Sequence, residues 1–335
     1  MSSAADIPAT KTLFTSHLVT SNYALYRPTY PPEMYALIKN EVEAQGIHIN
    51  RENSIVVDMA CGSGQATFGL AKPPMNANRI LGTDISPQQI QHARAKVEDE
   101  LKKLGRPEVK FHFEVGSVED IPAQLRALQT SDDQPLLPSI VTVAQAFHWL
   151  EVPKAMSVLY PLLQKTDAHP TGGAFAVIFY GSPFFETPAL QKIVMEDLYN
   201  ARLGNCWGAG RSHIDDEYRQ MAELIRSAQE PDAWEVHRFD PPEMASAGEQ
   251  SNVHRRVVDP SLRIVREMPL DGLIGYLSSW SAYGVWQKKK ADGLVDVSES
   301  DPIEECRQKL LKEVGSPDAL IKVTYPIGLF LCYPK

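Results

Sequence analysis

The stretch from residue 54 to residue 65 constrains the fold of this chain more than any other. A β-branched run reaches Asp58 and enters a turn of small residues, Ala60, Gly62 and Gly64, ahead of a helix predicted to start at Gln65. A buried strand that leads into a tight turn and a helix is typical of nucleotide-type α/β proteins. Small residues let a ligand lie against the turn backbone, and N–H groups at the helix start can bind an anionic group.

The spacing of this turn narrows the choice of ligand. Thr67 stands where the third glycine of a dinucleotide fingerprint would be, and no Gly-Lys-Ser/Thr sequence of a phosphate-binding loop follows. The Val-Asp-x-(small)-x-Gly-x-Gly pattern instead resembles the first motif of class I S-adenosylmethionine (SAM) methyltransferases. On its own, the turn leaves a dinucleotide site or an ordinary tight turn open.

The composition restricts the partners of the chain. Its 335 residues are 43% apolar, which suits a large core, while a net charge of -9 and a pI near 5.5 argue against nucleic acid and anionic membranes. The longest apolar stretch, 172–180, is far shorter than the ~20 residues of a membrane span, and no signal peptide is recognised. We expect a soluble cytoplasmic protein with four reduced cysteines, and the oligomeric state stays open.

Five segments with strand character alternate with helical patterns from residue 54 to residue 180. This alternation predicts a doubly wound, mostly parallel α/β sheet. The expected parts are a loosely held N-terminus (1–20), a cofactor-binding core (21–185), a cap over the carboxyl ends of the strands (186–290) and a C-terminal helix with strands that complete the sheet (291–335). Within the last two parts we expect one helix over 213–229, a solvated stretch over 287–302 and separate strands over 320–325 and 328–333.

A second acid, Asp84, ends the next predicted strand. Ser86 is placed to cap the following helix, and Pro87 is placed at its first position. In such folds an acid at the end of the second strand accepts hydrogen bonds from a ribose diol. The acid and the turn together are a much more specific signal than either alone.

Six motifs follow one another along the chain: Tyr23-x-x-x-Arg27-Pro28-x-Tyr30-Pro31, Val57-Asp58-x-Ala60-Cys61-Gly62-x-Gly64, Gly82-x-Asp84-x-Ser86, Phe147-His148-Trp149, Gly210-Arg211-Ser212 and Trp280-Ser281-Ala282-Tyr283. Together they resemble the trans-aconitate methyltransferase-like group of class I SAM enzymes. The resemblance runs from about residue 20 to the C-terminus. It implies a Rossmann-like methyltransferase fold, SAM as the cofactor and a small molecule as the methyl acceptor.

The resemblance also implies a set of cofactor contacts in strand order. Asp58 would orient the turn and the methionine amino group, and Asp84 would accept hydrogen bonds from the ribose hydroxyls. The other contacts would come from Ala60, Gly62 and Gly64 in the turn, Ile85 against adenine, Ser117 and Val118 at the adenine edge, and the backbone of Ala144 and Gln145 at the methionine end.

Two positions depart from the pattern of the group. Ser117 stands where an acid usually contacts the adenine amine, so this contact would be weaker or would pass to the Val118 backbone and Glu119. Ala60 stands where glycine is usual. The alanine is tolerable only if the backbone there does not need a positive φ.

The expected acceptor chemistry depends on two arginines. A carboxylate has a pKa of ~4 and is already ionised at neutral pH, so it needs orientation and no general base. The guanidinium groups of Arg27 and Arg211 would bind it bidentately. Supporting side chains would come from Tyr23, Tyr30 and Tyr283 and from the pocket aromatics Trp149, Trp207 and Trp280. The sequence therefore favours methyl ester formation on a small, trans-aconitate-like acid.

His148, beside Trp149 after the fourth strand, supports an alternative. If the acceptor were a phenol, an amine or a thiol, this histidine could take its proton, or it could only shape the pocket wall. A further alternative is a SAM-binding protein without catalysis. No His, Cys, Asp or Glu cluster has metal-ligand spacing in the sequence, so we expect no metal.

Overall fold

The computed structural model describes residues 26–129, 135–208, 210–228, 233–241, 253–258, 262–296 and 298–335. The expected N-terminal tail and Tyr23 therefore lie outside the described residues. The chain divides into two compact units. The sheet unit comprises residues 29–181, 213–263 and 326–335, and the helical unit comprises residues 1–28, 182–212 and 264–325.

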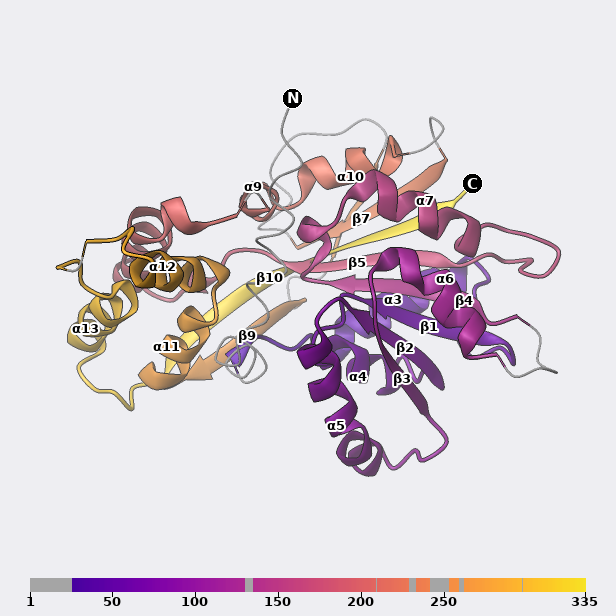
Figure 1. Cartoon of the computed structure of the whole chain (residues 1–335), viewed down its shortest axis with the longest axis horizontal. Helices are drawn as coiled ribbons and strands as arrows, with labels where there is room; N and C mark the ends of the chain where they lie inside the picture. The colour runs from indigo at the N-terminus through magenta and orange to yellow at the C-terminus, as the bar shows by residue number, and fades with distance from the viewer. Residues whose placement is uncertain are drawn as a thin grey trace. The chain divides into compact units, whose positions relative to one another are not determined.

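The sheet unit is built on strands in the order β3-β2-β1-β4-β5-β10-β7-β8. All of these except β8 are labelled in Figure 1. The first five are parallel, β10 is antiparallel to both β5 and β7, and β8 is parallel to β7. The doubly wound, mostly parallel fold is thus confirmed. The strands are β1 (Ser54–Met59), β2 (Arg79–Asp84), β3 (Lys110–Val115), β4 (Leu137–Ala144), β5 (Ala174–Tyr180), β7 (Trp234–Asp240), β8 (His254–Val257) and β10 (Ile321–Pro334).

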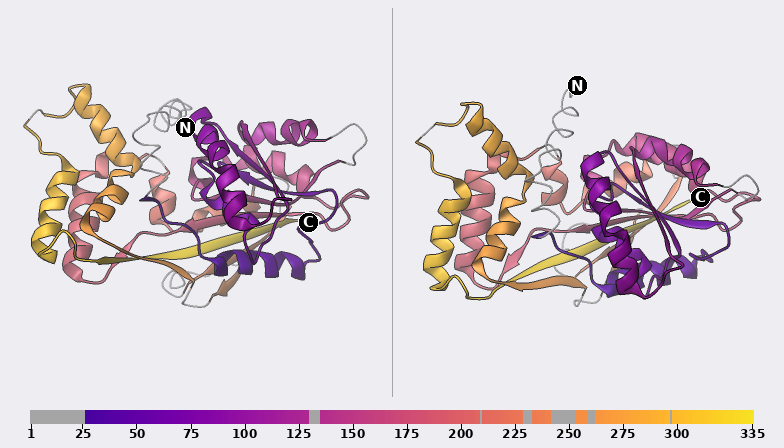
Figure 2. Two further views of the ribbon diagram at one scale, coloured as in Figure 1. Left: turned by 90° about the horizontal axis from the view of Figure 1, so that it is seen from below. Right: turned by 60° about the horizontal axis from the view of Figure 1, so that its bottom comes forward.

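Helices cover both faces of this sheet (Figure 2). Every residue of β1 and of β5 is buried, as expected for strands with a helix layer on each side. On one face α4 and α5 pack on Phe113, and on the other α6, α7 and α10 enclose a larger apolar cluster. The helices are α3 (Pro32–Ala44), α4 (Gln65–Ala71), α5 (Pro87–Leu104), α6 (Ile121–Ala127), α7 (Val152–Leu163) and α10 (Arg219–Arg226).

The helical unit consists mainly of packed helices. The π-helix η3 contacts α8, α13 and η4, while α11 contacts α12 and α13. The first residues of β10 pair here with β6 and β9. Its elements are β6 (Phe184–Phe185), α8 (Pro188–Gln191), η3 (Lys192–Arg202), η4 (Gly204–Cys206), β9 (Arg263–Met268), α11 (Leu270–Ser278), α12 (Ser281–Ala291) and α13 (Pro302–Val314), and α9 (Arg211–Asp215) begins in it.

Three expected elements differ in the structure. The helix expected over 213–229 is interrupted, because Glu217 and Tyr218 have positive φ and separate α9 from α10. The two C-terminal strands form one strand that continues through Pro326, whose carbonyl accepts a hydrogen bond from the Gly181 N–H. The solvated stretch expected from residue 287 starts later, because α12 extends to Ala291 with lysines in its last turn, where cations stabilise a helix.

The expected cap boundaries also differ from the observed units. Residues 213–263 belong to the sheet unit, because β7 pairs with β10 and its apolar side chains Trp234 and Val236 join the sheet's core. Helix α13, which we expected to complete the sheet, belongs to the helical unit. None of the helices within the described residues is long and apolar enough to span a membrane.

Candidate functional site

The turn after β1 has a left-handed backbone at three of its residues. φ is +52° at Ala60, +54° at Gly62 and +85° at Gly64. A Cβ at Gly64 would lie 2.7 Å from the Phe68 ring, so glycine is required there for space as well as for φ. A Cβ at Gly62 would meet no atom within 4 Å. The turn therefore has open space beside its backbone at Gly62.

The condition stated for Ala60 is not met. Alanine would be tolerated without strain only if the backbone there needed no positive φ, and Ala60 adopts φ +52°. A non-glycine residue in this region carries backbone strain of about 1–2 kcal/mol. The turn therefore keeps its left-handed shape at a cost in stability.

Replacing Ala60 by glycine is expected to increase the free energy of unfolding by about 0.5–1 kcal/mol, because glycine adopts φ +52° without strain. The matched control is Gly62→Ala, which places a methyl group at a similar φ with no clash. It should destabilise the protein by about 1 kcal/mol. Thermal unfolding of the three proteins tests both, and equal melting temperatures would contradict the strain.

Asp58 lies fully buried at the end of β1. The Thr67 hydroxyl donates to its Oδ2 at 2.6 Å, and the Thr142 hydroxyl donates to its Oδ1 at 2.7 Å. Burial raises the pKa of Asp58 to about 6, although these two hydrogen bonds oppose the rise. A buried carboxylate held in this way favours a cationic group beside the turn.

Asp84 connects the turn to the end of β2. One carboxylate oxygen accepts from the Gly62 N–H and the other from the Ser86 N–H, both at 2.9 Å. Burial raises the pKa of Asp84, and the two backbone donors partly offset this. Ser86 caps α5 through the Gln89 N–H, as expected. The carboxylate is thereby fixed at the carboxyl ends of β1 and β2, beside the switch point between β1 and β4.

Two apolar side chains are exposed beside these acids. Ile85 is 48% exposed and Val115, at the end of β3, is 47% exposed. An exposed Ile or Val at the carboxyl ends of the strands offers a flat apolar surface for a ring. Val115 is a residue that the sequence analysis did not select.

The residues expected at the adenine edge are engaged in local contacts. The Ser117 hydroxyl and N–H both contact the Asp120 carboxylate, forming a capping box at the start of a 3-10 turn. Glu119 forms an ion pair with Lys154 on α7. Val118 packs partly buried against the larger apolar cluster. These contacts hold Ser117 and Glu119 in place within the turn.

The end of β4 is tied to the end of β5. Gln145 has φ +51°, and its side-chain amide exchanges two hydrogen bonds with the Tyr180 backbone, at 2.8 and 3.2 Å. The Tyr30 ring lies 6.2 Å from the Tyr180 ring. The backbone at Ala144 and Gln145 is thus held in a fixed conformation at the same edge as the turn.

His148 and Trp149 follow on a 3-10 turn, Phe147–Trp149. The Nδ1 of His148 lies 2.5 Å from the hydroxyl of the buried Tyr218, and the Trp149 ring packs 4.9 Å from the histidine ring. Tyr218 was not expected as a partner, because its position depends on two left-handed residues, Glu217 and Tyr218 itself, that separate α9 from α10.

Within the helical unit, four of the expected side chains belong to one aromatic cluster. Trp280 contacts the rings of Tyr276, Tyr199 and Trp207 at centroid distances of 5.8, 5.4 and 5.6 Å. The Arg211 guanidinium stacks 4.5 Å from Tyr199, and Arg27 lies 5.9 Å from Tyr276. The cluster therefore carries an arginine at each end.

Further hydrogen bonds fix this cluster. Trp207 donates its indole N–H to the Tyr199 carbonyl at 3.0 Å, and Arg211 donates to Asn200 at 2.6 Å. Arg27 donates to the Ser279 carbonyl at 3.1 Å. Tyr199 and Tyr276 were missed by the sequence analysis because each looks like an ordinary core residue of a helix.

Tyr283 has a different setting from the one we expected. Its hydroxyl donates to Asp301 at 2.8 Å, and Asp301 caps α13. Its ring stacks on Trp286, with 6.0 Å between centroids. These contacts make Tyr283 a structural link between α12 and α13.

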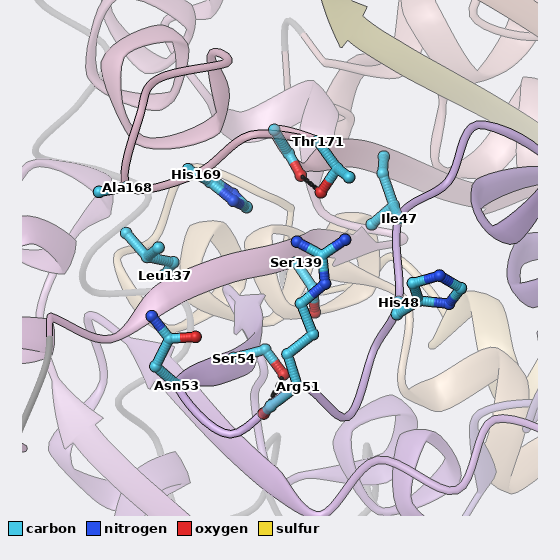
Figure 3. Close-up of a pocket in the computed structure, with 11 residues that line it drawn as sticks. Ile47, His48, Arg51, Asn53, Ser54, Leu137, Ser139, Ala168, His169 and Thr171 are labelled. Atoms are coloured by element: carbon cyan, nitrogen blue, oxygen red, sulfur yellow. Dashed lines mark hydrogen bonds between the residues drawn. The ribbon is translucent and has the colours of Figure 1, made fainter.

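A small cavity of about 20 Å³ lies at the amino ends of β1 and β4 (Figure 3). Arg51 and His169 are among its lining residues. Arg51 donates to the Gly46 carbonyl, and Nε2 of His169 contacts the Pro138 carbonyl. Its volume suits one water molecule. The turn lies at the carboxyl ends of the strands and the cavity lies at their amino ends, so the cavity is not part of the candidate site.

The turn and its neighbours fit SAM. A cationic methionine end suits buried Asp58, a ribose diol suits Asp84, and an adenine ring suits the exposed Ile85 and Val115. The open space at Gly62 leaves room for a ligand against the backbone. SAM, when bound, supplies an electrophilic methyl group.

Comparisons with known proteins agree with this fit. Residues 50–133 match the family model of a methyltransferase domain. A protein of Dictyostelium discoideum assigned as a methyltransferase is 25% identical over 317 residues, covering 93% of this chain and 92% of that protein. A ubiquinone/menaquinone biosynthesis C-methyltransferase of a Marinomonas species is 26% identical over 212 residues, covering 63% and 73%.

Among solved structures, an Anaeromyxobacter dehalogenans protein described as a type II methyltransferase superimposes with a TM-score of 0.57 at 22% identity, covering 91% of this chain and 97% of that one. This likeness shows a shared fold. The matches favour a methyltransferase over the dinucleotide site and the non-catalytic protein left open by the sequence. With the domain match covering both strand-end acids and the turn between them, the chain is an S-adenosylmethionine-dependent methyltransferase with the class I fold.

Proposed function

We propose that the methyl acceptor is a carboxylate of a small organic acid, as in the trans-aconitate methyltransferase-like group, and that the product is a methyl ester. The observation that supports this is the aromatic cluster with Arg27 and Arg211 at its ends. Stacking on a ring uses the face of a guanidinium and leaves its N–H donors directed in its plane. A pair of such groups suits an acid with more than one carboxylate.

The chain's own residues would then act by binding and orientation. The arginines would orient the ionised carboxylate, and Trp207, Trp280 and their tyrosine neighbours would exclude water from it. No proton has to be removed, because the carboxylate is already ionised at neutral pH. In the sheet unit, Asp58, Asp84 and the turn would hold the cofactor.

Incubation with labelled SAM and a small polycarboxylate such as trans-aconitate tests the proposal. The expected product loses its labelled methyl group as methanol in mild base, since esters hydrolyse there. A labelled product that is stable in base would contradict ester formation. A monocarboxylate of similar size should have a lower kcat/KM than the polycarboxylate, because it would contact only one of the two arginines.

Arg211→Gln is expected to lower kcat/KM for the acid about 10- to 150-fold, because hydrogen bonds to a charged group contribute about 1.5–3 kcal/mol. The affinity for SAM should be unchanged. The matched control is Arg126→Gln, at an exposed position of α6. Steady-state kinetics with both substrates varied would check this. An Arg211 variant with wild-type kinetics would exclude Arg211 as a ligand of the carboxylate.

A second candidate is methylation of a phenol, amine or thiol with His148 as the base. It is favoured by the short contact between His148 Nδ1 and the Tyr218 hydroxyl, which fixes the ring and assigns proton transfer to Nε2. His148→Ala and Arg211→Gln discriminate the two. Loss of turnover in the histidine variant alone would favour His148 as a general base. Loss in the arginine variant alone would favour binding of a carboxylate by Arg211.

A further inference from the structure

A group of three side chains lies at the edge of the sheet, away from the turn in the sequence. His237 on β7 is the register partner of His254 on β8, and Glu235 precedes His237 by two residues. Residues two apart on a strand share a face, and so do register partners on neighbouring strands. All three side chains therefore project from one face of the β7–β8 pair.

The ligand atoms of these side chains lie close together. His237 Nε2 is 2.6 Å from Glu235 Oε1, His254 Nε2 is 4.0 Å from the same oxygen, and the ligand atoms of the three residues all lie within 4.8 Å of one another. Metal–ligand bonds of ~2.0–2.2 Å separate tetrahedral ligand atoms by roughly 3.4 Å. On metal binding, the distance between His237 and Glu235 would increase and the distance between His254 and Glu235 would decrease, each by less than about 1 Å.

We propose that Glu235, His237 and His254 form a site for a transition-metal dication of the Zn²⁺ type. Two imidazoles and one carboxylate are a donor set that suits zinc, cobalt, nickel and copper, whereas calcium and magnesium prefer oxygen ligands alone. His254 is an exposed residue, which gives the ion access. From the sequence we expected no metal, because only the pairing of β7 with β8 brings the two histidines together.

A second group of charged side chains lies on the same two strands. This second group consists of Arg238, Arg255 and Asp240. Its residues alternate with the proposed metal ligands along the strands, so it lies on the opposite face of the β7–β8 pair. There Asp240 accepts from Arg238 at 2.7 Å and from Arg255 at 2.9 Å.

The proposed site would have a structural role. Among the described strands β8 is at the end of the sheet order, and it pairs with β7 alone. An edge strand with one partner is the part of a sheet that opens most easily. Asp240 already links β7 and β8 on one face, and a metal ion would link them on the other.

Titration of the full chain with Zn²⁺ tests the proposal, independently of methyl transfer. We expect saturable binding of one equivalent, with affinity lowered at least about 10- to 100-fold in His254→Ala and in Glu235→Gln. His48→Ala, at an exposed histidine elsewhere in the sheet unit, is the matched control and should bind as the wild type does. Zn²⁺ should raise the melting temperature of the wild type and the control, but not of the two site variants.

Co²⁺ in place of Zn²⁺ identifies the donor atoms. We expect a spectrum without thiolate charge-transfer bands, and paramagnetic shifts of the His237 and His254 ring resonances in NMR. Binding that is unchanged in both site variants would overturn the proposal. Thiolate bands that persist in both variants would assign the ion to the cysteines, and the absence of saturable binding would also overturn it.

Discussion

The Asp84→Asn variant is expected to bind SAM at least about 100-fold more weakly than the wild-type protein. Each oxygen of Asp84 accepts one backbone N–H, from Gly62 or Ser86, and a carboxylate oxygen has a second acceptor position for a ribose hydroxyl. Hydrogen bonds to a charged group contribute about 1.5–3 kcal/mol each. Two weakened bonds therefore correspond to about 3 kcal/mol, or about 100-fold in the dissociation constant.

Isothermal titration with SAM and with S-adenosylhomocysteine measures this effect. Asparagine has the size of aspartate, but it is neutral and one of its terminal atoms is a donor. The matched control is Glu114→Gln on the neighbouring strand β3, where the acid forms an exposed ion pair with Arg94. Equal affinities of the Asp84 variant and the wild type, with both proteins folded, would exclude Asp84 as a ribose ligand.

The sequence predicted the parallel part of the fold because its signals are local. The β-branched run at β1, the acid at Asp84 and the Ser86–Pro87 helix start each depend on a few neighbouring residues, and the structure confirms their elements. The four cysteines are buried free thiols, as expected. Thr67 served only to argue against a dinucleotide fingerprint, whereas the structure shows that it donates to Asp58.

The features that the sequence did not predict depend on distant pairing. A proline in the sequence argues against a continuous strand. In the structure β10 nevertheless continues through Pro326, because β5 and β7 pair with its second half on both sides. The short strand β8 is polar and exposed, so its pattern resembles a loop. The aromatic cluster needs Tyr199 and Tyr276 from two helices, and helix-to-helix contacts cannot be inferred from either segment alone.

Asp58→Asn is expected to change how stability depends on pH. The pKa of Asp58 is about 6 in the folded protein and 3.8 in the reference state, so between these values the folded protein keeps a proton that the unfolded chain has lost. The contribution of this group to the free energy of unfolding therefore falls as pH rises from about 4 to about 6. At 1.36 kcal/mol per pKa unit the loss is about 3 kcal/mol.

Comparison of the variant with the wild type isolates this contribution, because all other titrating groups are shared. The stability of Asp58→Asn relative to wild type should rise by about 3 kcal/mol between pH 4 and pH 7. The matched control is Asp99→Asn, on the exposed face of α5. Urea unfolding at several pH values measures both, and a flat difference for Asp58→Asn would show that its carboxyl does not titrate in this range.

The same carboxyl should make SAM binding depend on pH in the opposite sense. If Asp58 faces the methionine amino group, SAM binds the ionised form, and its affinity falls up to about tenfold per pH unit below pH 6. Asp58→Asn should remove this dependence and bind SAM weakly at every pH. A variant that gains stability at pH 7 and loses SAM affinity would show that the buried charge is kept for the ligand, at the expense of the fold.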